Sequence, residues 1–591
     1  MAVRSPFQHS SARFQCLSLL KQQGKSLFIA VSLLFTASAT AQEPPIYSSE
    51  DIFHPVIAQN GMVASQEKYA TQSGLDVLKE GGNAIDAAVT IGFTMAVTLP
   101  RAGNLGGGGF MMVHLAETGE TVAIDYREKA PKAATRDMFL DEEGEADPQK
   151  SQFSHLAVGV PGTVAGMVLA LEEYGTISLE RALQPAIALA EEGFPVDEDL
   201  YSSLVAAQEK MQPYPASQEI FYNDGVPYEV GDILVQEDLA NSLKLIAEEG
   251  KSAFYQGAIA EAISTEMEAN GGLITQEDLA DYEPVVREPI RGSYRGYEVY
   301  SMPPPSSGGI HLVQILNLLE KFPLGSLGHN TAQTIHLMVE SMKLAYADRF
   351  KFLGDTDFVD VPVARLISPQ YAEQIRDRID LEMATPSQQI LPGGTDRLES
   401  NDTTHYSVID SEGNAVANTY TLNFSYGTGI TVPGTGILLN NEMDDFTAKP
   451  GVANAYGLVG GEANVIEPEK RMLSSMTPTI VMKDDKPFLV TGSPGGSRII
   501  TTTLQILLNV IDHGMNIAAA TNAVRIHHQW FPDQLRIEQG LNADTVELLT
   551  LKGHEVEVGN AMGSTQSVMR VDGVPYGASD PRRTGALTLG Y

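Results

Sequence analysis

The spacing of apolar residues predicts alternating helices and strands along most of the chain. Apolar positions that recur every three to four residues, with polar residues opposite, indicate amphipathic helices. The continuous apolar run at 110–115 is instead typical of a buried strand. Gly81-Gly82 ends the first helix, and Asn83 begins the second. The helical segments predicted in this way are 65–80, 83–97, much of 162–283, 310–321 and 501–512.

The residues that follow Thr403 have the period-two pattern of a β-hairpin. β-Branched and aromatic residues continue toward Asp410, residues 411–414 are typical of a turn, and a second strand begins at Ala415. Pairing Asp410 with Ala415 brings Thr403 beside residues 421–423, with one residue of register error allowed. A hydroxyl at the start of one strand would then face a hydroxyl or an amide on its neighbour.

A facing hydroxyl can polarise a nucleophile, provided that the nucleophile also has a base. Cutting the chain between Asp402 and Thr403 would supply one, because an α-amino group titrates near pKa ~8, against ~10.4 for lysine. A threonine whose own amine accepts its proton is a known nucleophile–base pair. Taken alone, Thr403 could be an ordinary strand threonine. The motifs elsewhere in the chain therefore decide whether it is interpreted as a nucleophile.

Composition and charge narrow the classes of function. A chain of 591 residues that is 43% hydrophobic and 19% charged is globular and large enough for one or several cores. Its net charge is −36, and near −40 without the first 41 residues. Such a charge argues against nucleic acid and anionic membrane surfaces as partners.

Residues 1–41 are predicted to form an export signal. A basic stretch precedes an uncharged run, and Ala39-Thr40-Ala41 fits a small-x-small cleavage site before Gln42. The run is short for a membrane span, which needs ~20 apolar residues; an uncleaved N-terminal anchor is the alternative. The sole cysteine, Cys16, lies in this segment, so the mature chain would have no disulfide and no thiolate site. We expect a periplasmic or secreted protein.

Several other motifs have less specific interpretations. The glycines at 106–109 precede a strand and lack a following Gly-Lys-Ser/Thr, so close backbone packing or approach to a ligand is favoured over phosphate binding. The Pro-Pro-Pro-Ser-Ser-Gly-Gly segment at 303–309 is a rigid turn predicted to pack near the active centre; no Gly-x-Ser-x-Gly elbow accompanies it. His527-His528 is assigned a structural role. The polar segment 382–401 is predicted to be exposed, where a new chain end could move away after cleavage.

Residues 399–407, Glu-Ser-Asn-Asp-Thr-Thr-His-Tyr-Ser, resemble the processing site of the γ-glutamyltranspeptidases, a family of N-terminal-nucleophile hydrolases. The resemblance covers nearly all of the chain after residue 47. It implies a precursor cut between Asp402 and Thr403 into a large subunit, 42–402, and a small subunit, 403–591, which stay together as a heterodimer. It also implies an α+β fold, a four-layer αββα sandwich formed jointly by both subunits. No metal or organic cofactor is implied.

The resemblance also implies roles for individual residues. Thr403 is the nucleophile, Thr421 hydrogen-bonds its hydroxyl, and the backbone N–H groups of Gly495 and Gly496 hold the oxyanion. The residues implied in binding the γ-glutamyl group are Arg127, Ser474 and Ser475 for the α-carboxylate, Asn423, Glu442 and Asp445 for the α-ammonium, and Tyr456 in a lid at 450–471.

Each assignment has a plainer alternative. Arg127 could form a surface ion pair with Glu128, the acidic loop at 440–446 could bind calcium or be solvated, and a Gly-Gly turn is common. The family has Glu or Gln at the position of Glu442, so its charge is not required, and Asp445 is the stronger candidate.

The implied activity is that of a γ-glutamyltransferase and glutathione hydrolase. Through a γ-glutamyl-Thr403 ester, the acyl group of glutathione and related compounds would pass to water, amino acids or dipeptides. One alternative is an acylase that removes a glutaryl-type chain from a β-lactam amine; that substrate has no α-ammonium, so Asn423 and Asp445 argue against it. A non-catalytic periplasmic protein that retains the fold is the more distant alternative.

Overall fold

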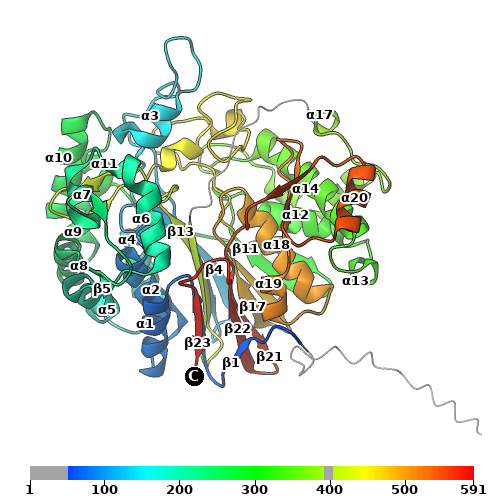
Figure 1. The fold of residues 1–591 in the computed structure, drawn as a ribbon, viewed down its shortest axis with the longest axis horizontal. Coiled ribbons are helices and arrows are strands. Elements are labelled where there is room, and N and C mark those ends of the chain that lie inside the picture. Colours follow the sequence, from blue (N-terminus) through cyan, green and yellow to red (C-terminus); the bar gives the residue numbers. More distant parts are fainter. Residues whose placement is uncertain (1–50, 392–402) are drawn as a thin grey trace, which may run out of the picture. The chain divides into compact units, whose positions relative to one another are not determined.

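Two seven-stranded antiparallel sheets form the centre of the molecule (Figure 1). They are seen in a computed structural model, which describes residues 51–391 and 403–591. The α+β class predicted from the sequence is confirmed. The predicted export signal with its cut after Ala41, and the scission residue Asp402, lie outside the described residues. Within the described ranges, no helix is both long enough and apolar enough to cross a membrane.

The first sheet contains the predicted hairpin. Its strands, in spatial order, are β23 (Leu587–Gly590), β2 (Met62–Ser65), β12 (Thr404–Ile409), β13 (Ala415–Thr421), β3 (Gly108–Leu115), β4 (Glu120–Tyr126) and β9 (Val285–Arg287). Ile409, not Asp410, pairs with Ala415, so the register is one residue from the simplest prediction and within its allowed error. Asp410 leaves the ladder because its carboxylate accepts hydrogen bonds from the backbone N–H groups of residues 412–414.

The second sheet packs face to face with the first. Its strands, in spatial order, are β1 (Val56–Ile57), β22 (Val574–Ser579), β21 (Gln566–Val571), β17 (Lys486–Thr491), β16 (Thr479–Lys483), β11 (Tyr297–Ser301) and β10 (Ile290–Tyr294). One buried apolar cluster joins Phe110 and Ala417 of the first sheet to Ile480 and Val568 of the second. Side chains alternate across each strand, so every other residue of these strands is left to face outward.

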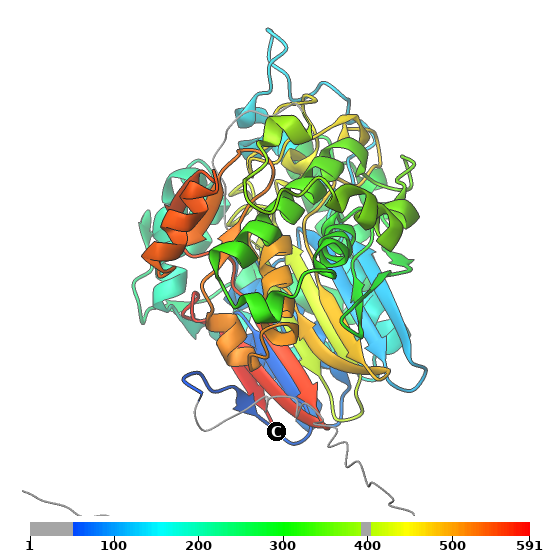
Figure 2. The ribbon, with the colours of Figure 1, turned by 90° about the vertical axis from the view of Figure 1, so that its right-hand side faces the viewer.

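Helices cover both outward faces (Figures 1 and 2). The first sheet is covered by α1 (Lys68–Lys79), α2 (Ala84–Thr98) and α4 (Thr163–Tyr174), and α5 (Leu179–Glu192) packs on the outer side of α2. The second sheet is covered by α12 (Gly308–Leu319) and α19 (Ile517–Asn522), and α14 (Ala332–Phe352) and α18 (Arg498–Ile511) pack against α12. The helices predicted within 162–283 are confirmed and continue as α6 (Glu198–Met211), α7 (Pro215–Phe221), α8 (Glu237–Glu249), α9 (Lys251–Tyr255), α10 (Ala258–Asn270) and α11 (Gln276–Ala280).

Some helix boundaries differ from the predicted ones. The first helix begins at Lys68 instead of residue 65, because Ser65 pairs with β12 and β23 as the end of β2. Glu67 caps the helix, since its carboxylate accepts hydrogen bonds from the backbone N–H groups of Tyr69 and Ala70. Asn83 caps α2 with a capping box, as the sequence predicted. The helix predicted at 501–512 begins earlier, at Arg498.

Strands from the two sides of the predicted cut alternate in space. In the first sheet, β2 lies between β23 and β12, and β13 pairs with β3. The second sheet has β1, β10 and β11 at its edges and later strands between them. Of the predicted exposed segment 382–401, the structure describes residues up to 391, including the short helix α17 (Ser387–Ile390).

Candidate active site

Thr403 and Thr421 lie side by side at the open end of the β12–β13 hairpin. The hydroxyl of Thr403 donates a hydrogen bond to the hydroxyl of Thr421 across 3.2 Å. The Thr421 hydroxyl oxygen also accepts a 2.9 Å hydrogen bond from the backbone N–H of Asn423. The backbone of Gly107 packs closely against Thr421: a Cβ at Gly107 would lie 2.1 Å from the carbonyl oxygen of Thr421, so only glycine fits there. The predicted hydroxyl contact is present, and the glycines at 106–109 serve close packing.

The backbone of Thr403 is strained. Its φ angle is +120°, a region in which a β-branched residue is an outlier and which costs about 1–3 kcal/mol. The side chain is 7% exposed, so the surrounding structure holds it in place. A break before Thr403 would relieve the strain, because φ of an N-terminal residue is no longer fixed by a preceding peptide group.

Thr403 opens into a cavity of about 310 Å³, named here the Thr403 cavity. Ten of the residues singled out from the sequence line it: Arg127, Thr403, Thr421, Asn423, Glu442, Asp445, Tyr456, Ser474, Ser475 and Gly496. Gly495 is not among the lining residues, although it adjoins one of them. Charged side chains of both signs line it, which suits a small polar molecule.

Arg127 follows β4 and forms the charged centre of the cavity. Its guanidinium donates to Glu442 and, across 2.5 Å, to Asp445, while Nε donates to the carbonyl oxygen of Met472 at 3.3 Å. The side chain is fully buried, which would lower its pKa, but the carboxylates of Glu442 and Asp445 outweigh this and raise the pKa. Arg127 is therefore a buried cation paired with acids, not the surface residue of the plainer interpretation.

Glu128 is a third acid beside Arg127. Its carboxylate lies 3.7 Å from Nη1 of Arg127 and is fully buried, and neither oxygen has a hydrogen-bond partner among the described residues. Burial raises the pKa of Glu128 to about 7, although Arg127 opposes the shift. Burial also raises the pKa values of Glu442 and Asp445. One guanidinium is thus shared by three carboxyl groups.

The raised pKa of Glu128 predicts a pH-dependent stability. The folded state binds this proton more tightly than the unfolded chain, so Glu128 stabilises the fold below its ordinary pKa of 4.5, and this contribution is lost as the pH rises to about 7. We expect Glu128→Gln to lessen the fall in Tm over this window. Thermal unfolding between pH 4 and 8 measures it, with the exposed Glu117→Gln as control. Parallel Tm profiles for Glu128→Gln and the unsubstituted protein would contradict the prediction.

Asn423 and Tyr456 close one side of the cavity. The Tyr456 hydroxyl lies 2.6 Å from Oδ1 and 2.8 Å from the carbonyl oxygen of Asn423, and the Asn423 amide donates to the carbonyl oxygen of Asn441. Gly496 lies against the Tyr456 ring, where a Cβ would come within 2.4 Å of a ring carbon. The segment that carries Tyr456 is therefore in place over the cavity.

The two glycines after β17 both have positive φ angles, +129° at Gly495 and +55° at Gly496. Side chains rarely adopt this conformation, so the turn requires glycine at both positions. Helix α18 begins two residues later, at Arg498. Its N-terminal end carries partial positive charge toward the same turn. This environment is favourable for developing negative charge.

Ser474 and Ser475 are held by the Pro-Pro-Pro-Ser-Ser-Gly-Gly turn. The N–H of Ser474 donates to the carbonyl oxygen of Pro305 at 2.8 Å, and the N–H and hydroxyl of Ser307 both donate to the carbonyl oxygen of Ser474 at 2.8 Å. The hydroxyl of Ser475 is buried without a hydrogen-bond partner among the described residues. The prediction that this turn packs near the site is confirmed.

Arg349 also lines the Thr403 cavity but was not singled out from the sequence. It occupies the last turn of α14, where a basic residue is common because it interacts favourably with the helix dipole. Its sequence context therefore gave no sign of a role at the site. Its surroundings can be judged only once α14 is placed against the acidic loop that carries Asp445.

One group of side chains in the described ranges has the spacing of metal ligands. His336, Glu340 and His554 are buried, and their candidate ligand atoms lie within 4.8 Å of one another. These atoms already have partners, because Nδ1 of His336 lies 2.8 Å from Nε2 of His554 and the Lys343 ammonium lies 3.1 Å from Glu340. The group is accounted for as a buried hydrogen-bond network.

The adjacent pair His527 and His528 is structural, as predicted. Nδ1 of His527 lies 2.8 Å from the hydroxyl of Thr501, and Nε2 of His528 lies 3.2 Å from Asp533. Burial lowers the pKa of His528 to about 4. Both rings therefore serve to satisfy hydrogen bonds in the core.

Known proteins resemble this chain along most of its length. The family model described as gamma-glutamyltranspeptidase matches residues 70–589. A glutathione hydrolase proenzyme of Escherichia coli (strain K12) is 58% identical over 94% of this chain and 97% of its own. A solved cephalosporin acylase of Bacillus halodurans has a TM-score of 0.80 at 29% identity, over 93% of this chain and 99% of its own. The solved γ-glutamyltranspeptidase of Helicobacter pylori has a TM-score of 0.54 at 50% identity, over 55% of this chain and 93% of its own.

Proposed function

The chain belongs to the γ-glutamyltranspeptidase family, and on this premise we propose that it cleaves glutathione and related γ-glutamyl amides and transfers the acyl group. One observation carries the proposal: two hydroxyls, Thr403 and Thr421, meet at 3.2 Å in a cavity that also holds a guanidinium and two carboxyl groups. The acyl acceptors are water, amino acids or dipeptides.

The chain matures by cutting itself. The Thr403 hydroxyl attacks the carbonyl carbon of Asp402, the peptide C–N bond breaks, and the acyl group moves from nitrogen to oxygen as an ester. Water then hydrolyses the ester, giving a carboxyl group on Asp402 and a free amine on Thr403. The positive φ of Thr403 supports this step, because breaking the bond relieves the strain.

The products are a large subunit, 42–402, and a small subunit, 403–591, which together form a four-layer αββα sandwich as a heterodimer. The alternation of early and late strands within both sheets supports a lasting association. The solved H. pylori chain matches over 93% of its length yet spans 55% of this chain, as expected of a protein held in two chains. The export signal ends after Ala41, and the mature protein is periplasmic or secreted.

In turnover, the Thr403 oxygen attacks the γ-amide carbonyl while the Thr403 amine accepts the hydroxyl proton. The N–H groups of Gly495 and Gly496 stabilise the oxyanion, and each such donor contributes about 2.7–4 kcal/mol in the transition state. Collapse of the intermediate expels cysteinylglycine, whose amine takes up the proton. Water or an amino group then attacks the γ-glutamyl-Thr403 ester and regenerates the hydroxyl.

The free end of the γ-glutamyl group is a zwitterion, and the cavity offers groups of both signs. Arg127, assisted by Ser474 and Ser475, binds the α-carboxylate; the hydroxyl of Ser475 supports this assignment because it has no hydrogen-bond partner within the described part of the chain. Asn423, Glu442 and Asp445 receive the α-ammonium. Binding exchanges the Arg127–Asp445 ion pair for two ion pairs with the substrate, so the net charge of the buried site is conserved. Tyr456 and its loop limit access by water.

A glutaryl-type acylase is the second candidate, favoured by the similarity to the solved cephalosporin acylase. A glutaryl chain has no α-ammonium, so its carboxylate would take Arg127 from Asp445 without supplying a cation in its place. Comparing kcat/KM for γ-glutamyl-p-nitroanilide and glutaryl-p-nitroanilide tests the proposal. We expect the γ-glutamyl compound to be favoured; faster release from the glutaryl compound would establish the acylase instead. A single uncut band after expression would contradict the maturation step.

Thr421→Val is expected to slow both maturation and turnover by roughly 10-fold, because it removes one hydrogen bond to the nucleophile. Valine preserves the shape of the side chain. A time course on a denaturing gel measures maturation, and the rate of p-nitroaniline release from γ-glutamyl-p-nitroanilide measures turnover. Thr90→Val is the control, since the Thr90 hydroxyl is buried in α2 and has no hydrogen bond to any residue that the structure describes. Unaltered maturation of Thr421→Val would remove Thr421 from the mechanism.

A further inference from the structure

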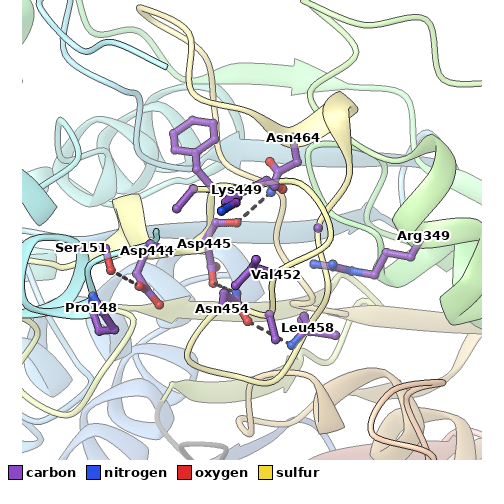
Figure 3. A pocket seen from close by; sticks show the side chains of 16 residues that line it. Pro148, Ser151, Arg349, Asp444, Asp445, Lys449, Val452, Asn454, Leu458 and Asn464 are labelled. Atoms are coloured by element: carbon purple, nitrogen blue, oxygen red, sulfur yellow. Dashed lines mark hydrogen bonds between the residues drawn. The ribbon is translucent and has the colours of Figure 1, made fainter. Parts of the chain in front are cut away.

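Arg349 lies on a wall shared by two cavities. The first is the Thr403 cavity; the second, of about 440 Å³, lies beneath the loop at 446–460 and is named here the Asp444 cavity. Arg349, Asp445 and Leu458 line both of them. Figure 3 shows the Arg349 side chain entering the Asp444 cavity from the side opposite to Ser151 and Asp444.

The guanidinium of Arg349 is buried without a direct ion pair among the described residues. The residue is 5% exposed, and no carboxylate among the described residues lies within 4.0 Å of it. Its hydrogen bond runs from Nε to the hydroxyl of Ser307 at 3.3 Å, which leaves both Nη groups free to bind a ligand. Burial lowers the pKa of Arg349 to about 10, although the carboxylate of Asp445 opposes the shift from beyond 4.0 Å, so the group remains charged at neutral pH. An unpaired buried charge is unfavourable unless a partner arrives.

Other buried arginines of this chain have such partners. Arg127 contacts Glu442 and Asp445, and Arg525 lies 2.5 Å from Asp580. Arg349 therefore differs from them in charge pairing, although it is buried to a similar degree. Arg349 can therefore accept an anion in direct contact, and the Thr403 cavity, which it lines, is where an anionic group of the substrate would enter.

The α-carboxylate of the substrate needs more positive charge than Arg127 provides. Three acids, Glu128, Glu442 and Asp445, already surround that guanidinium. The α-ammonium and α-carboxylate are attached to the same carbon, so an ammonium bound at Asp445 brings the carboxylate to the wall that Asp445 shares with Arg349. We propose that Arg349 is a second guanidinium of the α-carboxylate subsite and contacts the γ-glutamyl donor directly.

This proposal rests on the proposed function and adds a specificity-determining residue to it. Arg127 and Arg349 would hold the carboxylate between two planar donors, an arrangement that suits carboxylates better than a single point charge does. Ser307, which also donates to the carbonyl oxygen of Ser474, links Arg349 to the serines of the same subsite. Loss of Arg349 could therefore act through this link as well, and the test must separate the two effects.

The experiment compares two donors that differ only at the proposed contact. One is γ-glutamyl-p-nitroanilide, and the other is its analogue with the α-carboxylate converted to a carboxamide. For Arg349→Met we expect the ratio of kcat/KM between the two donors to fall about 10- to 100-fold, mainly through KM of the carboxylate donor. Arg349→Lys, which keeps the charge, should recover part of the ratio.

Two control variants complete the design. Lys351→Met removes an exposed charge from the same helix as Arg349 and should keep the ratio of the unsubstituted enzyme. Ser307→Ala removes the link to Ser474 but keeps the guanidinium, so its ratio should fall less than that of Arg349→Met, and an equal fall in the two variants would overturn the proposal. An equal loss on both donors in Arg349→Met and Arg349→Lys would overturn the proposal in favour of a structural role. A change confined to KM of a dipeptide acceptor would overturn it too, by placing the contact on the acceptor.

The activity of the unsubstituted enzyme on γ-glutamyl-p-nitroanilide tests the proposed function by itself. Activity in that enzyme together with an unchanged donor ratio in Arg349→Met would contradict the Arg349 proposal alone. A denaturing gel of each variant shows whether the chain has matured. If Arg349→Met fails to mature, the donor ratio of Arg349→Lys decides, because a direct contact predicts a fall in the ratio there also.

Discussion

Replacing Thr403 by alanine is expected to leave the precursor as one uncut chain and to abolish turnover. The substitution removes the oxygen that attacks the Asp402 carbonyl, and the missing cut also withholds the amine that serves as base. Loss of a catalytic nucleophile lowers kcat by about 10⁴-fold or more. A denaturing gel and N-terminal sequencing measure the cut, and p-nitroaniline release measures turnover.

Two further variants make this test specific. Thr403→Ser keeps a hydroxyl and should mature, more slowly than the unsubstituted protein. Thr404→Val is the matched control, because the neighbouring hydroxyl is buried and has no hydrogen-bond partner in the described ranges, so its loss should change neither maturation nor rate appreciably. Normal cutting of Thr403→Ala would refute the assignment of the nucleophile.

Replacing Arg127 by methionine is expected to have two separable effects. KM for a γ-glutamyl donor should rise about 10- to 100-fold or more, since a charged hydrogen bond to the α-carboxylate is lost. The protein should also lose about 3–5 kcal/mol of stability, because Glu442 and Asp445 remain buried without their cation. Steady-state kinetics and denaturant unfolding measure the two effects.

A double variant distinguishes these effects. Adding Glu442→Gln to Arg127→Met removes one of the unpaired charges, so stability should recover in part while KM stays high. Arg136→Met is the control, since that guanidinium is 51% exposed and pairs with Glu462 at the surface. An unchanged KM in Arg127→Met would show that Arg127 does not bind the carboxylate.

The local pattern of the sequence predicted much of the fold near Thr403. Alternating residues on both sides of a turn defined the hairpin, and its register was accurate to one residue because hairpin pairing is local. The first helix was placed too early, at Ser65, because pairing with β12 and β23 decides where β2 ends. Those partners are hundreds of residues away, and no local pattern shows them.

In the candidate site, too, the features set by local sequence could be predicted and those set by distant parts of the chain could not. Thr421 could be located from hairpin spacing, and the other lining residues from motifs that resemble the family. The charge environment could not be predicted, because Glu128, Glu442 and Asp445 meet Arg127 only after β4 and the acidic loop come together. Arg349 was missed for the same reason, since α14 belongs to the layer that covers the other sheet.

The position of β2 between β12 and β23 has a consequence for handling the mature enzyme. Its ladder of hydrogen bonds joins residues from both sides of the cut, and β13 against β3 adds a second such ladder. Pulling the halves apart would expose unpaired strand edges that readily aggregate. We therefore expect the two polypeptides to copurify until a denaturant is added, and neither to refold when produced alone.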